Sequence, residues 1–222
     1  MIKAIFWDND GVLVDTEGLF FRANQEILAG VGITLRWEQF EEISLARGES
    51  VLRLAADPKT DVFNQLRRER DDRYADLLTR EPLVIDGVRE VLDTLRGKYV
   101  MGIVTSSGHE HFSIIHRQSG LLPYFQFVLT LKDCLQVKPH PEPYLKALDL
   151  SGFAPDECLV IEDSPRGLAA ALSAGIRCIV IPSKFTSGNN FAGAYKILNS
   201  VKELPSVLVD GGSRPLRRCC NS

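Results

Sequence analysis

The sequence lacks long apolar runs and a strong excess of either charge. No apolar run approaches the roughly 18 residues that a membrane-spanning helix needs, so we expect no membrane partner. The net charge is −3, from 26 basic and 29 acidic residues, and no long basic stripe is present, so we expect no nucleic-acid partner. The first ten residues already contain Asp8 and Asp10, unlike a secretory signal peptide, and we therefore expect a cytoplasmic protein.

Cysteine is scarce, with five in 222 residues. The odd number, and the wide spacing of most of the cysteines, argue against a disulfide framework. Cys158 and Cys178 lie beside apolar runs and are interpreted as small core residues. Cys219 and Cys220 lie in a polar, basic tail that has no two further soft ligands for zinc. We expect this tail, residues 210–222, to be disordered.

Several short apolar runs are present, and they indicate buried strands. These runs are Ile2–Trp7, Val100–Val104, Phe127–Leu131, Cys158–Ile161 and Cys178–Ile181. From the second run onward, helical patterns separate them; the clearest are Gly87–Leu95, Pro141–Leu150 and Ser164–Ala174. Strands that alternate with helices predict a mostly parallel sheet with helices on both faces. The length suits one such core with a modest insertion.

The stretch from residue 16 to residue 82 breaks this alternation. It is rich in Glu, Arg, Leu and Ala, and no strand pattern is convincing. Helices are predicted over Glu17–Ala29, Trp37–Arg47, Glu49–Ala55 and Thr60–Thr79. We therefore divide the chain into an α/β core, residues 1–15 and 83–209, and an inserted all-α helical cap, residues 16–82.

Polar clusters follow four of the predicted strands, where open α/β sheets bind ligands. The first contains Asp8, Asp10 and Gly11. Two neighbouring carboxylates are costly unless a cation offsets their repulsion, although a polar turn is an alternative explanation. The second is Thr105 with Ser106 and Ser107, whose hydroxyl and N–H groups either hold phosphate oxygens or cap a helix.

The third and fourth clusters add a lysine and a second acidic pair. Lys138 precedes a proline between a strand and a helix, so it either neutralises a phosphate or is an ordinary surface lysine. Glu162 and Asp163 directly follow an apolar strand. Adjacent acids there indicate a hard cation bound through oxygen, although Asp163 would also serve as a helix cap.

Together, the four clusters resemble the motifs of the haloacid dehalogenase superfamily of phosphohydrolases. The matching segments are Asp8-x-Asp10-Gly11-Val12 with Asp15-Thr16, then Thr105, then Lys138-Pro139, then Glu162-Asp163-Ser164-x-x-Gly167. The order and the position of the helical insertion fit as well. The resemblance covers nearly the whole chain and is strongest to the β-phosphoglucomutase-like branch. It implies a Rossmann-like core with a small helical cap. Because the insertion leaves the core right after Asp15 and returns before Gly87, we expect it to move over the site as a lid.

The resemblance also implies a mechanism and a set of catalytic residues. Asp8 would attack phosphorus to form an aspartyl phosphate, and Asp10 would act as acid and base. Thr105 and Lys138 would complete the phosphate site, with Ser106 and Ser107 beside it. The implied cofactor is Mg²⁺, held by Asp8, Asp163, Glu162 and the backbone carbonyl of Asp10. The substrate would be a small-molecule phosphate monoester.

One departure from this branch concerns the cap. Sugar-phosphate mutases of the branch carry a histidine at the position of Phe20, and a phenyl ring neither relays protons nor hydrogen-bonds a sugar. Hydrolysis is therefore favoured over mutase activity. Phe20, Phe21, Arg47 and Glu49 are the candidate substrate contacts of the cap.

A phospho-accepting receiver module is a more distant alternative. Receiver domains are shorter, have no helical insertion, and place their lysine after all of their acids. Here Glu162 and Asp163 follow Lys138. The sequence carries no signal for a particular oligomeric state.

Overall fold

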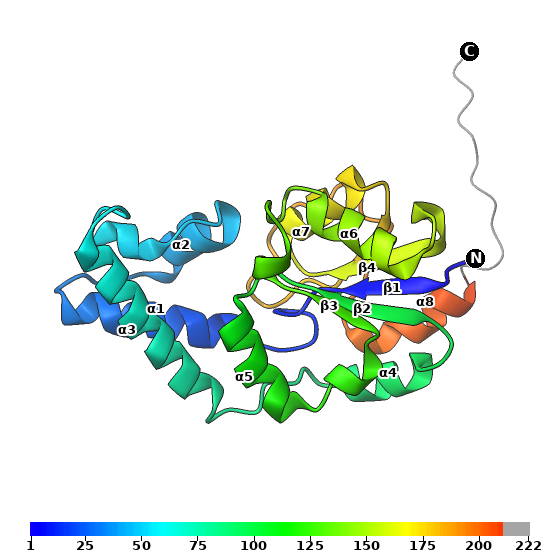
Figure 1. Cartoon of the computed structure of the whole chain (residues 1–222), viewed down its shortest axis with the longest axis horizontal. Coiled ribbons are helices and arrows are strands. Elements are labelled where there is room, and N and C mark those ends of the chain that lie inside the picture. The colour runs from blue at the N-terminus through cyan, green and yellow to red at the C-terminus, as the bar shows by residue number, and fades with distance from the viewer. Residues whose placement is uncertain (211–222) are drawn as a thin grey trace, which may run out of the picture.

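A six-stranded parallel sheet forms the centre of the molecule (Figure 1). The computed structural model describes residues 1–210, so Cys219, Cys220 and nearly all of the predicted tail lie outside the described residues. The strand order is β3-β2-β1-β4-β5-β6. The strands are β1 (Ala4–Trp7), β2 (Val100–Val104), β3 (Phe127–Leu129), β4 (Cys158–Glu162), β5 (Arg177–Val180) and β6 (Lys196–Ile197).

Strand β1 shows why the predicted strands are apolar throughout. Its four residues are all fully buried. Ile5 and Trp7 pack into one hydrophobic core and Ala4 and Phe6 into another, because successive side chains of a strand point to opposite faces of the sheet. A strand covered on both faces needs apolar residues at every position.

Helices cover both faces of the sheet, as predicted (Figure 1). One face is covered by α4 (Val88–Leu95), α5 (His109–Ser119) and α8 (Leu204–Asp210). The other face is covered by α6 (Glu142–Ser151) and α7 (Pro165–Ser173). No helix among residues 1–210 is long and apolar enough to cross a membrane.

The insertion is helical and has a hydrophobic cluster of its own. It contains α1 (Glu17–Gly30), α2 (Trp37–Phe40), α3 (Asp61–Leu78) and shorter helical turns. Its cluster is built from Leu28, Leu35, Phe40, Val51, Leu52, Phe63 and Leu66. The two chain segments that join it to the core lie side by side, because the Asp15 N–H donates to the Leu83 carbonyl over 2.9 Å.

Parts of the secondary-structure prediction were wrong in detail. The helix predicted over Trp37–Arg47 is α2 followed by a π-helical turn, Glu41–Ala46, and that predicted over Glu49–Ala55 is a 3₁₀ turn, Val51–Leu54. Gly48 separates the two with a φ of +68°, which a regular helix does not allow. Helices α5 and α8 and strand β6 were not predicted individually. The two residues of β6 are both exposed, so no apolar run marks it.

Candidate active site

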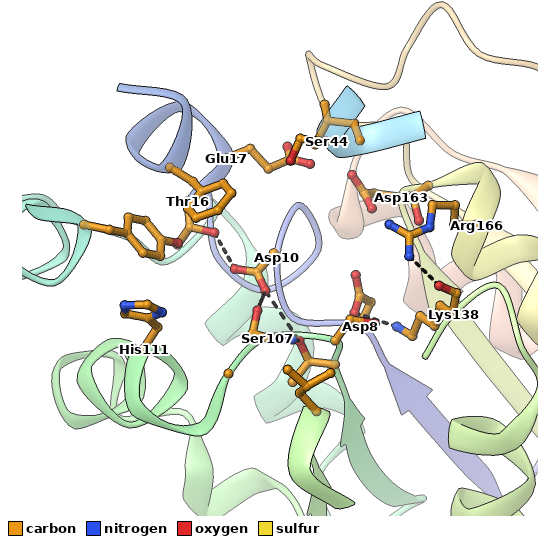
Figure 2. Close-up of a pocket in the computed structure, with 18 of the residues that line it drawn as sticks. Asp8, Asp10, Thr16, Glu17, Ser44, Ser107, His111, Lys138, Asp163 and Arg166 are labelled. Atoms are coloured by element: carbon orange, nitrogen blue, oxygen red, sulfur yellow. Dashed lines mark hydrogen bonds and ion pairs between the residues drawn. The ribbon is translucent and has the colours of Figure 1, made fainter. Parts of the chain in front are cut away.

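The four polar clusters meet at the carboxyl ends of the strands (Figure 2). They face a cavity of about 840 Å³ between the sheet and the helical insertion. The core lines it with Asp8, Asp10, Thr105, Ser106, Ser107, Lys138 and Asp163, and the insertion with Thr16, Glu17, Phe20, Phe40, Arg67, Arg70 and Tyr74. A cavity of this size accommodates a small organic ligand.

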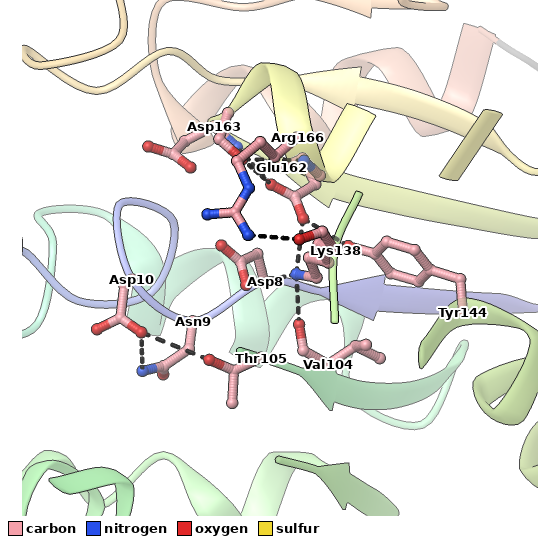
Figure 3. A network of polar contacts seen from close by, with 12 residues as sticks. Asp8, Asn9, Asp10, Val104, Thr105, Lys138, Tyr144, Glu162, Asp163 and Arg166 are labelled. Carbon is pink, nitrogen blue, oxygen red and sulfur yellow. Dashed lines mark hydrogen bonds and ion pairs between the residues drawn. The ribbon is translucent and has the colours of Figure 1, made fainter. Parts of the chain in front are cut away.

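Lys138 holds Asp8 in place. Its ammonium group lies 2.7 Å from Asp8 Oδ1, 2.7 Å from Glu162 Oε1 and 2.7 Å from the Val104 carbonyl (Figure 3). These three acceptors use all three of its N–H donors. Lys138 is only 5% exposed, so it is not the surface lysine of the alternative explanation.

Glu162 in turn fixes Lys138. Its Oε1 also accepts from the Tyr144 hydroxyl at 2.7 Å, and its Oε2 accepts from Ser164 Oγ at 3.1 Å and from the Asp163 N–H at 3.3 Å. A Cβ on Gly167 would lie 1.8 Å from the Glu162 carboxyl carbon, so only glycine fits there. Glu162 is completely buried, and both of its oxygens have protein partners.

Three carboxylates gather beside this lysine. One oxygen each of Asp8, Glu162 and Asp163 lies within 4.8 Å of the others. Burial, together with the charge of Glu162, raises the pKa of Asp8 to about 8, against the opposing effect of Lys138. Burial also raises the pKa of Asp163, and Glu17 and Asp8 add to the increase. Three buried acids with one ammonium fit a divalent cation, since hard oxygen donors are what Mg²⁺ prefers.

Gly11 allows the loop after β1 to pass beneath Asp163. Its φ is +81°, and a Cβ at this position would lie 2.3 Å from Asp163 Oδ2. Any side chain would therefore strain the backbone and also displace a carboxylate of the acidic cluster.

The Asp10 carboxylate faces the cavity rather than the acidic cluster (Figure 2). Thr16 Oγ1 donates to its Oδ1 over 2.5 Å. Its Oδ2 accepts from Ser107 Oγ, from Thr105 Oγ1 at 3.4 Å and from Asn9 Nδ2 at 3.3 Å. The side chain is thus directed into the cavity, and only the backbone carbonyl of Asp10 was predicted to bind metal.

Thr105, Ser106 and Ser107 lie together on the loop between β2 and α5, and all three line the cavity. Thr105 Oγ1 accepts from the Ser107 N–H at 3.0 Å, which tightens the loop. The start of α5 follows at His109, so these groups lie near the positive end of a helix dipole.

The predicted cap contacts divide into one that lines the cavity and three that do not. Phe20 lines the cavity. Phe21 packs against Trp37 and Phe40 inside the insertion. Arg47 and Glu49 are exposed and form ion pairs with Glu42 and Arg53, respectively. Substrate contact by Arg47 would require its ion pair to open, and it stays a prediction.

Several residues that shape the cavity were not found from the sequence. Burial and nearby Asp10 raise the pKa of Glu17 to about 7. Arg70 stacks on Phe20, with 4.7 Å from its guanidinium carbon to the ring centroid, and Arg166 Nη2 donates to the Lys138 carbonyl over 2.5 Å. The position of Arg166, three residues after Asp163, is a local signal that could have indicated it. No such signal distinguished Arg70 from the other charged residues on its helix.

Comparison with known proteins identifies the family of this chain. Residues 5–181 match the model of the haloacid dehalogenase-like hydrolase family, so the chain belongs to this family. Protein YhcW of Bacillus subtilis (strain 168) is 32% identical over 94% of this chain and 96% of its own. The phosphorylated carbohydrates phosphatase of Thermotoga maritima is 30% identical over 80% of this chain and 84% of its own.

Solved structures show the same architecture. The crystal structure of CbbY from Rhodobacter sphaeroides in complex with phosphate has a TM-score of 0.80 and 29% identity, covering 92% of this chain and 96% of that one. A complex of a CbbY mutant with xylulose-(1,5)bisphosphate has a TM-score of 0.81 and 28% identity, with the same coverage. The predicted α/β fold and the predicted family are therefore confirmed.

Proposed function

We propose that this protein is a Mg²⁺-dependent phosphatase that hydrolyses small-molecule phosphate monoesters. The observation that carries the proposal is the arrangement around Asp8. Lys138 holds this carboxylate, Asp163 lies beside it, and Asp10 faces the same cavity with its own separate set of donors. The relative that is named a phosphorylated carbohydrates phosphatase, and the CbbY complex with phosphate, support this substrate class.

In the first step, Asp8 attacks the phosphorus of the ester. A carboxylate oxygen forms the new bond to phosphorus while the bond from phosphorus to the leaving oxygen breaks, which gives an aspartyl phosphate. Asp10 donates its proton to the leaving oxygen, so a neutral alcohol departs. Lys138 balances negative charge on Asp8 and on the transferred group.

In the second step, water attacks the aspartyl phosphate. Asp10, now ionised, takes one proton from this water. The bond between phosphorus and the Asp8 oxygen breaks, which releases inorganic phosphate and restores both carboxyl groups to their initial state. The covalent intermediate divides one difficult displacement into two easier ones.

Asp8 and Asp163 are the residues best placed to hold the metal, with the carbonyl of Asp10 and with Glu162 as further donors. When bound, Mg²⁺ would supply positive charge that offsets the negative charge on the phosphoryl oxygens. Because Lys138 and Tyr144 already occupy Glu162 Oε1, we assign Glu162 mainly to positioning Lys138.

Phe20 favours hydrolysis over a sugar-phosphate mutase reaction. Its ring packs edge to face against Tyr74, with centroids 5.1 Å apart, and it lines the cavity above the reacting groups. This side chain has no group that hydrogen-bonds or transfers protons to a sugar hydroxyl.

The direct test is a screen of phosphate esters with purified protein and Mg²⁺. We expect release of inorganic phosphate from several small esters, including acetyl phosphate, and loss of release in excess EDTA. Activity that survives exhaustive chelation would refute the metal assignment. Long retention of the phosphoryl group after exposure to acetyl phosphate would instead favour a receiver-like module.

A further inference from the structure

Asn9, between the two catalytic aspartates, is linked to a buried histidine. Asn9 is fully buried, and its Oδ1 lies 2.8 Å from His116 Nε2. His116 lies on α5, is 3% exposed, and its Nδ1 lies 2.9 Å from Ser119 Oγ. On the other side, Asn9 Nδ2 donates to Asp10 Oδ2 over 3.3 Å (Figure 3). A continuous chain of hydrogen bonds thus runs from Ser119 to Asp10.

The carboxylate of Asp10 fixes the direction of every hydrogen bond in this chain. Asp10 Oδ2 already accepts from the hydroxyls of Thr105 and Ser107, so the Asn9 amide must turn its NH₂ toward this oxygen and its own oxygen toward His116. The Nε2 of His116 must then carry the proton, and its Nδ1 must accept from the Ser119 hydroxyl. The opposite tautomer would place two acceptors 2.8 Å apart, and a flipped amide would place its oxygen against a carboxylate.

The surroundings of His116 maintain this arrangement. Its ring lies against Phe112, with centroids 4.3 Å apart, and burial lowers the pKa of His116 to about 4, which keeps the imidazole neutral. Ser119 Oγ accepts from the Leu121 N–H at 3.1 Å, which leaves the hydroxyl proton free for His116. The guanidinium of Arg89 binds the Ser119 carbonyl and so fixes the end of α5.

The Asn9 contact also distinguishes the two oxygens of Asp10. Oδ2 is surrounded by three donors, from Asn9, Thr105 and Ser107, whereas Oδ1 has Thr16 as its donor. Oδ2 is therefore the oxygen fixed by the surrounding network, and its position sets the direction of Oδ1. Loss of the Asn9 contact would remove one of the three donors that fix this orientation.

We propose that His116 and Ser119 are positioning residues, which act through Asn9 to orient the Asp10 carboxyl group for proton transfer to the leaving oxygen. The inference rests on the proposed function, because it assigns Asp10 as the acid. Neither residue lines the cavity. The effect should therefore appear in proton transfer rather than in phosphate binding.

The test compares two substrates that differ in their need for an acid. An alkyl phosphate has a poor leaving group that requires protonation, whereas p-nitrophenyl phosphate has a good leaving group that does not. For His116→Leu we expect kcat/KM on the alkyl phosphate to fall about 10-fold or more, because small misplacements of a catalytic group are costly, and kcat/KM on p-nitrophenyl phosphate to fall less than about 3-fold. The comparison uses kcat/KM because it reports the first step, in which the leaving groups differ, and not the hydrolysis of the aspartyl phosphate, which both substrates share.

Two milder variants keep the inference testable if His116→Leu does not fold. His116→Gln retains a donor near the position of Nε2 and should recover most of the alkyl phosphate activity. Ser119→Ala removes the hydroxyl that donates to His116 and accepts from the Leu121 N–H, and it should lower the alkyl phosphate rate about 3-fold. Ile115→Val, a buried neighbour on α5 with no part in the chain, is the control for general destabilisation and should leave the ratio of the two rates unchanged.

A double-mutant cycle with Asn9→Leu tests whether His116 acts through Asn9. The double variant should be no slower than the slower single variant, because both substitutions break the same connection. Equal losses on both substrates, or fully additive losses in the cycle, would overturn the inference. If the wild-type protein hydrolyses neither ester, the proposed function itself fails, so the two failures are distinguishable.

Discussion

The ion pairs of Lys138 in the core and the pair of Arg53 with Glu49 in the helical insertion differ sharply in their environment. In the core, the side chains of Lys138, Asp8 and Glu162 are 6%, 12% and 0% exposed. In the insertion, the pair of Arg53 and Glu49 is 46% and 42% exposed. A buried pair leaves an uncompensated charge when one partner is removed, whereas water replaces the lost partner of an exposed pair. Similar contacts therefore contribute very differently in the two regions.

This difference suits a division of labour between the two regions. The buried network holds Asp8 in one geometry, which an in-line displacement requires. The exposed pairs of the insertion rearrange at little cost, which suits a surface that meets ligands of varied shape. One firm contact between the regions is Trp37 of α2 on Phe185 of the loop after β5, with ring centroids 4.5 Å apart.

The largest effect should follow removal of the nucleophile. Asp8→Asn replaces the attacking carboxylate with an amide, a very poor nucleophile, and we expect turnover to fall by at least about 10⁴-fold. Release of inorganic phosphate measures it, with circular dichroism to verify the fold. Near wild-type rates in this variant would refute the role of Asp8 as the nucleophile.

Two lysines of one segment provide a matched comparison of a buried and an exposed cation. Lys138→Ala leaves Asp8 and Glu162 buried without their shared partner, so we expect kcat/KM to fall about 10²-fold or more and stability to fall by about 3–5 kcal/mol. Lys132 is exposed, and Lys132→Ala should change kcat/KM less than about twofold. Steady-state kinetics and urea unfolding measure both effects, and equal losses would contradict the assignment.

Metal binding should stabilise the acidic cluster independently of turnover. Because Asp8, Glu162 and Asp163 repel one another, Mg²⁺ at 100 times its dissociation constant should raise the melting temperature by a few degrees, on the order of 5 °C. Asp163→Asn should abolish this shift and should not lower stability without metal. Asp72→Asn, at an exposed position on α3, is the control that keeps the shift. A shift that survives Asp163→Asn would place the metal elsewhere.

Adjacent phenylalanines of the insertion allow a test of substrate choice. Phe20 lines the cavity and Phe21 does not. Phe20→Leu should alter KM for sugar phosphates about 2- to 10-fold and leave acetyl phosphate nearly unchanged, because that small substrate offers little for the insertion to contact. Phe21→Leu should preserve the substrate ranking. If Phe20→Leu and Phe21→Leu rank the sugar phosphates and acetyl phosphate in the same order, Phe20 does not select substrate.

The smallest effect should come from the exposed pair of Arg53 and Glu49. Arg53→Ala should lower the free energy of unfolding by less than about 1 kcal/mol, and the loss should shrink at high salt. Urea unfolding at low and at high ionic strength measures it. A loss as large as that of Lys138→Ala would remove the distinction between the two regions.

The core of this protein was predictable because its signals are local. A strand such as β1, buried on both faces, is an apolar run in the sequence, and the acids and hydroxyls that follow such runs are brought together by the parallel sheet. Asp8, Thr105, Lys138 and Asp163 therefore stood out by their position after strands, while their expected roles came from the resemblance of the four clusters, taken together, to a known family. Strand β6 was missed because its two exposed residues leave no such pattern.

The insertion and the inner polar contacts were less predictable. Whether Arg47 or Arg70 faces the cavity depends on the rotation and packing of short helices, and both lie in highly charged stretches. The contact of Asn9 with His116 joins residues 107 positions apart, and nothing in either local sequence indicates it. Such contacts follow from how α5 packs beneath the sheet, which periodicity alone does not specify.

The hydrogen bond between Asp15 and Leu83 has a consequence for engineering. The chain leaves the core and returns to it at two adjacent points, where Val14 and Val84 also pair. Closing this gap with a short turn would require no displacement of β1, and a longer or differently shaped module could be spliced in at the same two points. The inserted domain can therefore be replaced by a different one while the sheet and its acidic residues stay unchanged.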